Sequence, residues 1–79
     1  MASQRTFFIT GASSGIGRAT AQLVAERGGR VALFARREPV LRDVAAEVRE
    51  RGGEALVVAG DVRDRERLAQ AVAETVEAF

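Results

Sequence analysis

Apolar residues along the chain alternate between short continuous runs and longer stretches with helical spacing. The runs cover residues 6–10, 30–35 and 55–59, and near-continuous apolar runs of this length are typical of strands buried on both faces. The stretches between and after them carry apolar residues at every third or fourth position, which predicts amphipathic helices. We therefore expect the order strand, helix, strand, helix, strand, helix.

The expected helices have recognisable ends. Pro39 suits the first turn of the second helix, where its missing N–H is not needed. Asp64 is a good N-cap residue for the third helix. Pairs of glycines at 28–29 and 52–53 are expected to end the first and second helices.

The inner faces of these helices are predicted from the spacing of their apolar residues. The predicted stripes are Ile16, Thr20, Leu23 and Val24 in the first helix, Leu41, Val44, Ala45 and Val48 in the second, and Leu68, Ala71, Val72, Thr75, Val76 and Phe79 in the third. On the outer side of the second helix, two pairs are spaced for ion pairs of about 0.2–0.5 kcal/mol each. These pairs are Glu38 with Arg42 and Glu47 with Arg51.

A glycine-rich turn joins the first strand to the first helix, with the sequence T-G-A-S-S-G-I-G at residues 10–17. Gly11 can adopt a backbone conformation closed to other residues, Gly15 lets a pyrophosphate approach the main chain, and Gly17 lets the helix lie close to the strand. The N–H groups and dipole of the first helical turn favour a phosphate. Ile16 is expected to contribute its N–H and to bury its side chain. The candidate ligands are Gly11, Ser13, Ser14, Gly15, Ile16 and Gly17.

The order of elements predicts an α/β fold. Strands joined by helical crossovers run parallel, and right-handed crossovers give the spatial order 3-2-1 with the first two helices on one face. With the glycine turn, this is the β-α-β-α-β-α half of a Rossmann-type, doubly wound sheet. We interpret residues 1–79 as the N-terminal part of a single dinucleotide-binding domain, truncated within a helical pattern. The first strand then keeps an unpaired apolar edge, so we expect the isolated chain to associate.

Composition narrows the classes of function. All twelve basic residues are arginine, against eleven acidic residues, which gives a net charge of +1 and argues against a nucleic-acid-binding surface. The chain has no Cys and no His, so we expect no disulfide and no metal site. We find no signal peptide and no apolar segment near the roughly 18 residues of a membrane span. We therefore expect a cytoplasmic protein without membrane partners.

The motif at residues 10–17 resembles the T-G-x-x-x-G-x-G cofactor motif of the short-chain dehydrogenase/reductase family, with every fixed position present. A P-loop is excluded because its motif needs a lysine and the chain has none. The resemblance extends over the whole chain but covers only the first half of the family's domain. It implies an oxidoreductase that moves hydride between a nicotinamide dinucleotide and a carbonyl or alcohol substrate. It also implies that the full-length protein is a homo-oligomer.

The residues after the second strand indicate which dinucleotide is bound. Ala35 stands about twenty residues beyond the glycine turn, where an NAD enzyme carries Asp or Glu for the ribose 2′-hydroxyl, and Arg36 and Arg37 follow. A guanidinium can hold a 2′-phosphate through charge-assisted hydrogen bonds. We therefore expect NADP (NADPH) in preference to NAD, in agreement with the resemblance, with Arg36 as the stronger candidate. The alternative is that both arginines only begin a surface helix, with Glu38 as their partner.

An acidic and an apolar residue, Asp61 and Val62, follow the third strand. The resemblance implies that Asp61 accepts a hydrogen bond from the adenine amino group while Val62 lies against the ring. The alternative is that Asp61 only forms a turn, a common role for Asp after a strand.

The catalytic residues of the family have no counterpart in the chain. The resemblance implies a Tyr in a Y-x-x-x-K motif with a Ser and an Asn, but the chain has no Tyr, Lys or Asn, and its serines lie in or before the glycine turn. We therefore expect the 79 residues to hold a cofactor without catalysing a reaction alone. Two interpretations stay open: the NADP-binding portion of a longer oxidoreductase, or a non-catalytic module that binds nucleotide or associates with another chain. A nucleotide-free, flavodoxin-like domain fits the glycine turn and Arg36 less well.

Overall fold

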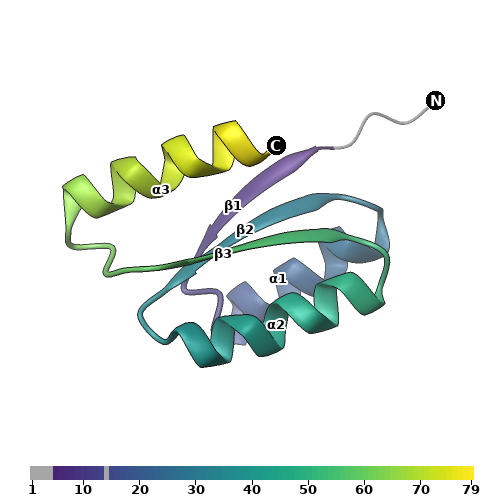
Figure 1. Cartoon of the computed structure of the whole chain (residues 1–79). Helices are drawn as coiled ribbons and strands as arrows, with labels where there is room; N and C mark the ends of the chain where they lie inside the picture. Colours follow the sequence, from purple (N-terminus) through teal and green to yellow (C-terminus); the bar gives the residue numbers. More distant parts are fainter. Residues whose placement is uncertain (1–4, 14) are drawn as a thin grey trace.

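A three-stranded parallel sheet with helices on both faces forms the body of the computed structural model (Figure 1), which describes residues 5–13 and 15–79. The elements follow the expected order. They are β1 (Thr6–Thr10), α1 (Gly15–Glu26), β2 (Arg30–Ala35), α2 (Glu38–Glu50), β3 (Glu54–Ala59) and α3 (Arg65–Ala78).

The strands lie in the order β1-β2-β3, which is the predicted arrangement with β2 in the centre. Thr10 of β1 pairs with Phe34 of β2, and Phe34 pairs with Val58 of β3. Because the three strands are parallel and end at nearly the same level, the loops that follow them meet at one edge of the sheet. We call this the carboxyl edge. It is the edge at which ligands bind in open α/β sheets.

The core has one part on each face of the sheet. Helices α1 and α2 cover one face and α3 covers the other (Figure 1), which confirms the prediction for the first two helices. On the α3 face, Phe34 packs against Phe8 with their ring centroids 5.7 Å apart, in a cluster that includes Ala71. The predicted stripe of α2 is wholly buried, and its residues are Leu41, Val44, Ala45 and Val48.

Helix α1 meets the sheet through small residues, contrary to the prediction. Ala21 and Ala25 are fully buried, whereas Leu23 is 54% exposed and Ile16 is 86% exposed. Glycines bring the backbone close to this helix: a Cβ at Gly17 would lie 2.3 Å from the carbonyl oxygen of Gly11, and a Cβ at Gly53 would lie 2.9 Å from Ala25. Small side chains fill the narrow space that remains. Val24 packs against the core, and it is the one residue of the predicted stripe that does so. The stripe was Ile16, Thr20, Leu23 and Val24.

Helix α3 contacts the sheet through only part of its predicted face. Ala71 and Thr75 are buried, and Leu68 packs against the core. Val72 and Val76 are exposed, so their predicted burial is wrong. Each of these valines follows a buried residue by one position, which shows that the contact with the sheet is narrower than the apolar stripe.

The predicted helix ends are present. Pro39 lies in the first turn of α2. The carboxylate of Asp64 accepts a hydrogen bond from the N–H of Arg67 at 3.1 Å, which is the expected N-cap of α3. Gly28 and Gly52 follow α1 and α2 with φ angles of +75° and +94°, the left-handed conformation that commonly ends a helix.

One of the two ion pairs predicted along α2 forms, and the other is replaced. Arg42 Nη2 lies 2.8 Å from Glu38 Oε2, as expected. Glu47 instead accepts hydrogen bonds from Arg18 of α1, whose Nε lies 3.0 Å from Oε1. Arg51 likewise pairs with a glutamate of α1. The hydrogen bond from Arg18 lowers the pKa of Glu47. The contacts of Glu47 with Arg18 and of Arg51 with α1 join α1 to α2.

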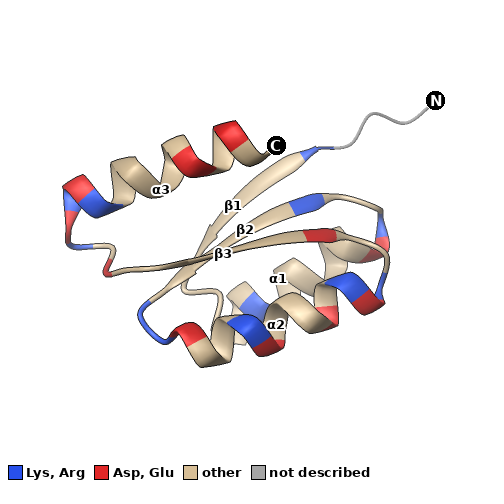
Figure 2. Cartoon of the chain, viewed as in Figure 1, with Lys and Arg blue, Asp and Glu red and all other residues tan. Residues whose placement is uncertain are grey.

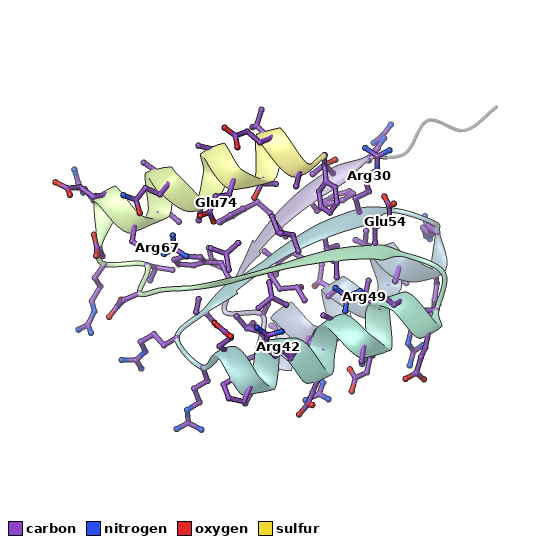
Figure 3. All side chains as sticks on the ribbon, in the orientation of Figure 1. Arg30, Arg42, Arg49, Glu54, Arg67 and Glu74 are labelled. Atoms are coloured by element: carbon purple, nitrogen blue, oxygen red, sulfur yellow. The ribbon has the colours of Figure 1, made fainter. Side chains whose placement is uncertain are left out.

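Arg30 connects three elements at the opposite, amino edge of the sheet (Figure 3). Its Nε lies 2.9 Å from Glu54 Oε2 at the start of β3. Its Nη1 donates to the carbonyl oxygen of Phe79 at 3.2 Å, and its guanidinium lies 5.8 Å from the centroid of the Phe79 ring. This one side chain therefore ties β2 and β3 to the residue that follows α3.

Candidate functional site

The glycine turn after β1 has the backbone geometry that its sequence predicts. Gly11 and Gly15 have φ angles of +63° and +59°, a region that residues with a Cβ rarely adopt. A Cβ atom at Gly17 would lie 2.3 Å from the carbonyl oxygen of Gly11, so only glycine fits between the turn and the helix. Among the described residues, none beyond its chain neighbours and its own helix comes within 4 Å of the Cβ position at Gly15. Ser14 lies outside the described residues.

A cleft of about 250 Å³ opens at the carboxyl edge. It is bounded by the glycine turn after β1, the link from β2 to α2, and the loop from β3 to α3. Its lining residues are Gly11, Ser13, Ala35, Arg36, Arg37, Gly60, Asp61 and Val62. The fold thus brings together residues that the sequence analysis named in three separate segments. Gly15, Ile16 and Gly17 lie in the first turn of α1, beyond this lining.

Two residues that fix these loops were missed by the sequence analysis. Ala12 is fully buried, and its N–H donates to the carbonyl oxygen of Phe34 at 3.4 Å. The N–H of Gly60 donates to the carbonyl oxygen of Ala35 at 2.9 Å, and a Cβ at Gly60 would lie 2.8 Å from the Phe34 ring. A glycine directly after an apolar run was the available signal for Gly60. The sequence offers no comparable signal for Ala12.

Arg36 and Arg37 line the cleft with unpartnered side chains. Both are exposed, and within the described part of the chain neither guanidinium forms a hydrogen bond or an ion pair. If the two arginines only began a surface helix, Glu38 was the expected partner. Glu38 pairs with Arg42 instead. Figure 2 shows the two arginines as a basic segment between β2 and α2. Their donors are therefore available to an anion in the cleft.

Asp61 takes part in a turn as well as lining the cleft. Its Oδ1 accepts a hydrogen bond from the N–H of Arg63 at 2.9 Å, and its Oδ2 lies 2.8 Å from Arg63 Nη2. Hydrogen bonds from Arg63, helped by the charge of Arg36, lower the pKa of Asp61 to about 2. The turn-forming role that the sequence left as an alternative is thus present. The carboxylate is ionised at neutral pH and remains a wall of the cleft.

The loop after β3 is held to the sheet by Arg67 of α3. Its Nε donates to the carbonyl oxygen of Ala59 at 2.9 Å, and Figure 3 shows this side chain lying between α3 and the end of β3. Its Nη1 also lies 3.6 Å from Glu74 Oε1. The position of Asp61 therefore depends on the packing of α3 against the sheet.

A larger hollow of about 410 Å³ lies at the amino edge of the sheet. It is lined by Arg5, Phe7, Val24, Arg27 and Gly29. The smaller cleft is the candidate site, because open parallel sheets bind ligands at their carboxyl edge. None of the residues around the larger hollow belongs to the glycine turn.

Comparison with protein families identifies the chain. Residues 5–79 match the family model described as short chain dehydrogenase. The chain belongs to the short chain dehydrogenase family.

Three relatives illustrate how much of such a protein the chain represents. The A-factor type gamma-butyrolactone 1′-reductase (1S-forming) of Streptomyces virginiae is 45% identical over 95% of the chain and 29% of its own length. L-sorbose reductase from Gluconobacter frateurii, solved with NADPH and L-sorbose, is 36% identical with a TM-score of 0.90, over 98% of the chain and 30% of its own. NADH-dependent reductase A1-R′, complexed with NAD, is 30% identical with a TM-score of 0.86, over 96% and 32%. The chain thus spans less than a third of these short chain dehydrogenases and reductases.

The site of this short chain dehydrogenase chain differs from expectation at Ile16. Its side chain was expected to be buried, but it is exposed at the start of α1, so its backbone N–H alone remains a candidate ligand. Within residues 5–13 and 15–79, no group of three or more His, Cys, Asp or Glu side chains is arranged to hold a metal ion. Over the same residues, no helix is both long and apolar enough to cross a membrane.

Proposed function

We propose that this chain is the NADP-binding part of a short chain dehydrogenase that transfers hydride between NADPH and a carbonyl or alcohol substrate. The observation that carries the proposal is the cleft at the carboxyl edge, in which the glycine turn faces Arg36 and Asp61. Members of this family, by their names, oxidise or reduce substrates of several kinds. The substrate of the whole protein, and its assembly as a homo-oligomer, are parts of the proposal that rest on the family alone.

The residues of the cleft fit the parts of NADP. The pyrophosphate is assigned to the glycine turn and the first turn of α1, where backbone N–H groups and the helix dipole favour negative charge. The adenosine 2′-phosphate is assigned to Arg36, assisted by Arg37, because a guanidinium forms paired, charge-assisted hydrogen bonds to phosphate oxygens. The ligands proposed at the pyrophosphate are Gly11, Ser13, Ser14, Gly15, Ile16 and Gly17.

The adenine is assigned to Asp61 and Val62. A carboxylate accepts a hydrogen bond from the 6-amino group, and the valine supplies an apolar surface for the ring. The cleft, at about 250 Å³, falls just below the range of about 300–1,000 Å³ for complete small-molecule pockets. Its size is thus suited to the adenosine end of a dinucleotide. When bound, the cofactor supplies or accepts the hydride.

The 79 residues bind and orient the cofactor in this proposal, and proton transfer falls to residues elsewhere. The chain contains no Tyr and no Lys, the residues of the family's catalytic motif. This observation also supports the second candidate, a non-catalytic module that binds the nucleotide or associates with another chain. The coding sequence beyond residue 79 separates the two. A Ser followed by a Y-x-x-x-K motif supports the enzyme, whereas an in-frame stop codon supports the module.

The cofactor preference is tested by titrating the chain and its Arg36→Asp variant with NADPH and NADH, followed by nicotinamide fluorescence. The wild-type chain should bind NADPH more tightly than NADH. Arg36→Asp should weaken NADPH binding by about tenfold or more, because it removes a charge-assisted hydrogen bond of about 1.5–3 kcal/mol and adds a repelling carboxylate. Arg27→Asp makes the same charge change at the amino edge and should leave the NADPH to NADH ratio unchanged. An unaltered NADPH affinity in Arg36→Asp refutes the proposed preference.

A further inference from the structure

The carboxylate of Asp61 has almost no hydrogen-bonding capacity left. Oδ1 accepts from the N–H of Arg63 at 2.9 Å and from its Nε at 3.2 Å. Oδ2 accepts from the same Nε at 3.2 Å and from Nη2 at 2.8 Å. A carboxylate offers about four lone-pair sites, so both sites of Oδ1 and at least one of Oδ2 are used by a single neighbouring residue.

The backbone N–H and the guanidinium of Arg63 differ in how easily a ligand can displace them from Asp61. The N–H of Arg63 is part of the turn, which is closed by a second hydrogen bond from the N–H of Asp64 to the carbonyl oxygen of Asp61 at 2.9 Å. The side chain of Arg63 is 79% exposed and is not part of the cleft lining. An exposed ion pair is weak, so the guanidinium can be displaced while the turn remains.

We propose that Arg63 competes with the adenine amino group for the Asp61 carboxylate and so sets how strongly the cleft prefers a 6-aminopurine to a 6-oxopurine. This inference rests on the proposed binding of an adenine dinucleotide at the cleft. A 6-amino group is a donor and competes with the guanidinium for Oδ2 of Asp61, where the Nε and Nη2 of Arg63 already lie at 3.2 and 2.8 Å. A 6-oxo group is an acceptor, which the carboxylate repels and the guanidinium of Arg63 can satisfy. Arg63 therefore disfavours adenine and favours hypoxanthine.

The experiment measures the dissociation constants of NADPH and of its hypoxanthine analogue for the wild-type chain and for Arg63→Ala. The ratio of the hypoxanthine to the adenine dissociation constant should rise about two- to fivefold in Arg63→Ala, the factor to which one exposed ion pair corresponds. Taking the ratio cancels the general loss of affinity that follows from removing a positive charge near an anionic ligand. Arg65→Ala, which removes an exposed charge at the start of α3, should leave the ratio unchanged.

A second variant separates competition from a change in the turn. Both variants keep the backbone N–H that anchors Asp61, but Arg63→Gln also keeps a polar side chain while losing the charged fork, so it should raise the ratio in the same direction. Circular dichroism checks that each variant stays folded. A ratio that is unchanged or lower in both Arg63 variants overturns the inference. If the wild-type chain binds neither dinucleotide, the proposed function fails as well. If it binds NADPH and loses that binding in Arg36→Asp, an unchanged ratio defeats only the role of Arg63.

Discussion

The carbonyl oxygen of Gly11 occupies the space that a side chain at Gly17 would need, since a Cβ at residue 17 would lie only 2.3 Å away. The contact locks the start of α1 onto the end of β1. It also holds the first helical turn beside the cleft, so the same pair of residues controls both packing and the proposed phosphate site.

Gly17→Ala should therefore destabilise the fold, even though alanine favours a helix by up to about 1 kcal/mol. The added methyl group meets backbone atoms that have little freedom to move, and overpacking of this kind removes about 1–3 kcal/mol of stability. Urea unfolding followed by circular dichroism measures the effect. Ala19→Ser, at an exposed position of the same helix, should change little. A Gly17→Ala variant as stable as the wild type would contradict the close approach of α1.

The Asp61 carboxyl should titrate with a midpoint of about 2, below its ordinary value of about 3.9. Because the folded-state pKa is lowered, the contribution of Asp61 to stability is full above pH 4 and is lost as pH falls towards 2. Carbon-13 NMR of the carboxyl group gives the midpoint directly. In Arg63→Ala the midpoint should move upward, because the largest cause of the lowered pKa is removed. A midpoint near 4 in the wild-type chain would show that Arg63 does not hold the carboxylate in solution.

Arg30→Ala should lower the free energy of unfolding by about 1 kcal/mol. An ion pair near the surface contributes about 0.2–1 kcal/mol and a cation–π contact about 0.5–1 kcal/mol, and the contacts of Arg30 include an ion pair with Glu54 and a cation–π contact with Phe79. Chemical denaturation measures the change. The conservative Arg30→Lys variant keeps the charge but loses the planar fork, so it should fall between the wild type and Arg30→Ala. Equal stability of all three proteins would show that this contact does not hold α3.

The isolated 79-residue chain should self-associate through the free edge of β1. This strand pairs with β2 alone in the described residues, and Phe7 on it is 40% exposed beside Val24 of α1. Sedimentation velocity at high micromolar concentration should show species larger than a monomer. Phe7→Lys should shift the distribution towards monomer, because charged residues at sheet edges oppose pairing, whereas Val76→Lys on α3 should have less effect. A single monomer peak with cooperative melting for the wild-type chain would contradict this prediction.

The sequence predicted the fold where local pattern and tertiary packing agree. Val44 and Val48 lie on one helical stripe, and no other face of α2 competes with it. On α1 the prediction placed the large residues Leu23 and Ile16 on the buried face, because large apolar residues count for more than alanine in a hydrophobic pattern. The helix nevertheless lies so close to its neighbours, with Gly17 against Gly11 and Ala25 against Gly53, that the fully buried positions are taken by Ala21 and Ala25. A periodicity argument does not include that distance.

The candidate site was predicted in the same uneven way. Arg36 was predicted as a ligand because its position after the second strand carries a clear electrostatic meaning. Its side chain has no hydrogen-bond or ion-pair partner among the described residues, and its role at a cofactor stays a prediction. Glu47 was paired with Arg51 by sequence spacing, but its partner is Arg18 of another helix, which depends on how α1 and α2 pack. The contact of Asp61 with Arg63 is local, yet its spacing of two residues belongs to a turn whose shape the sequence did not define.

The exposed position of Arg36 has a consequence for the evolution of such a protein. The preceding residue, Ala35, ends the buried central strand, whereas the side chain of Arg36 is exposed and does not pack in the core. A single codon there can be exchanged without disturbing the interior. Under the proposed function, a substitution at residue 36 could change the preference of the protein between NADP and NAD without any change in its core.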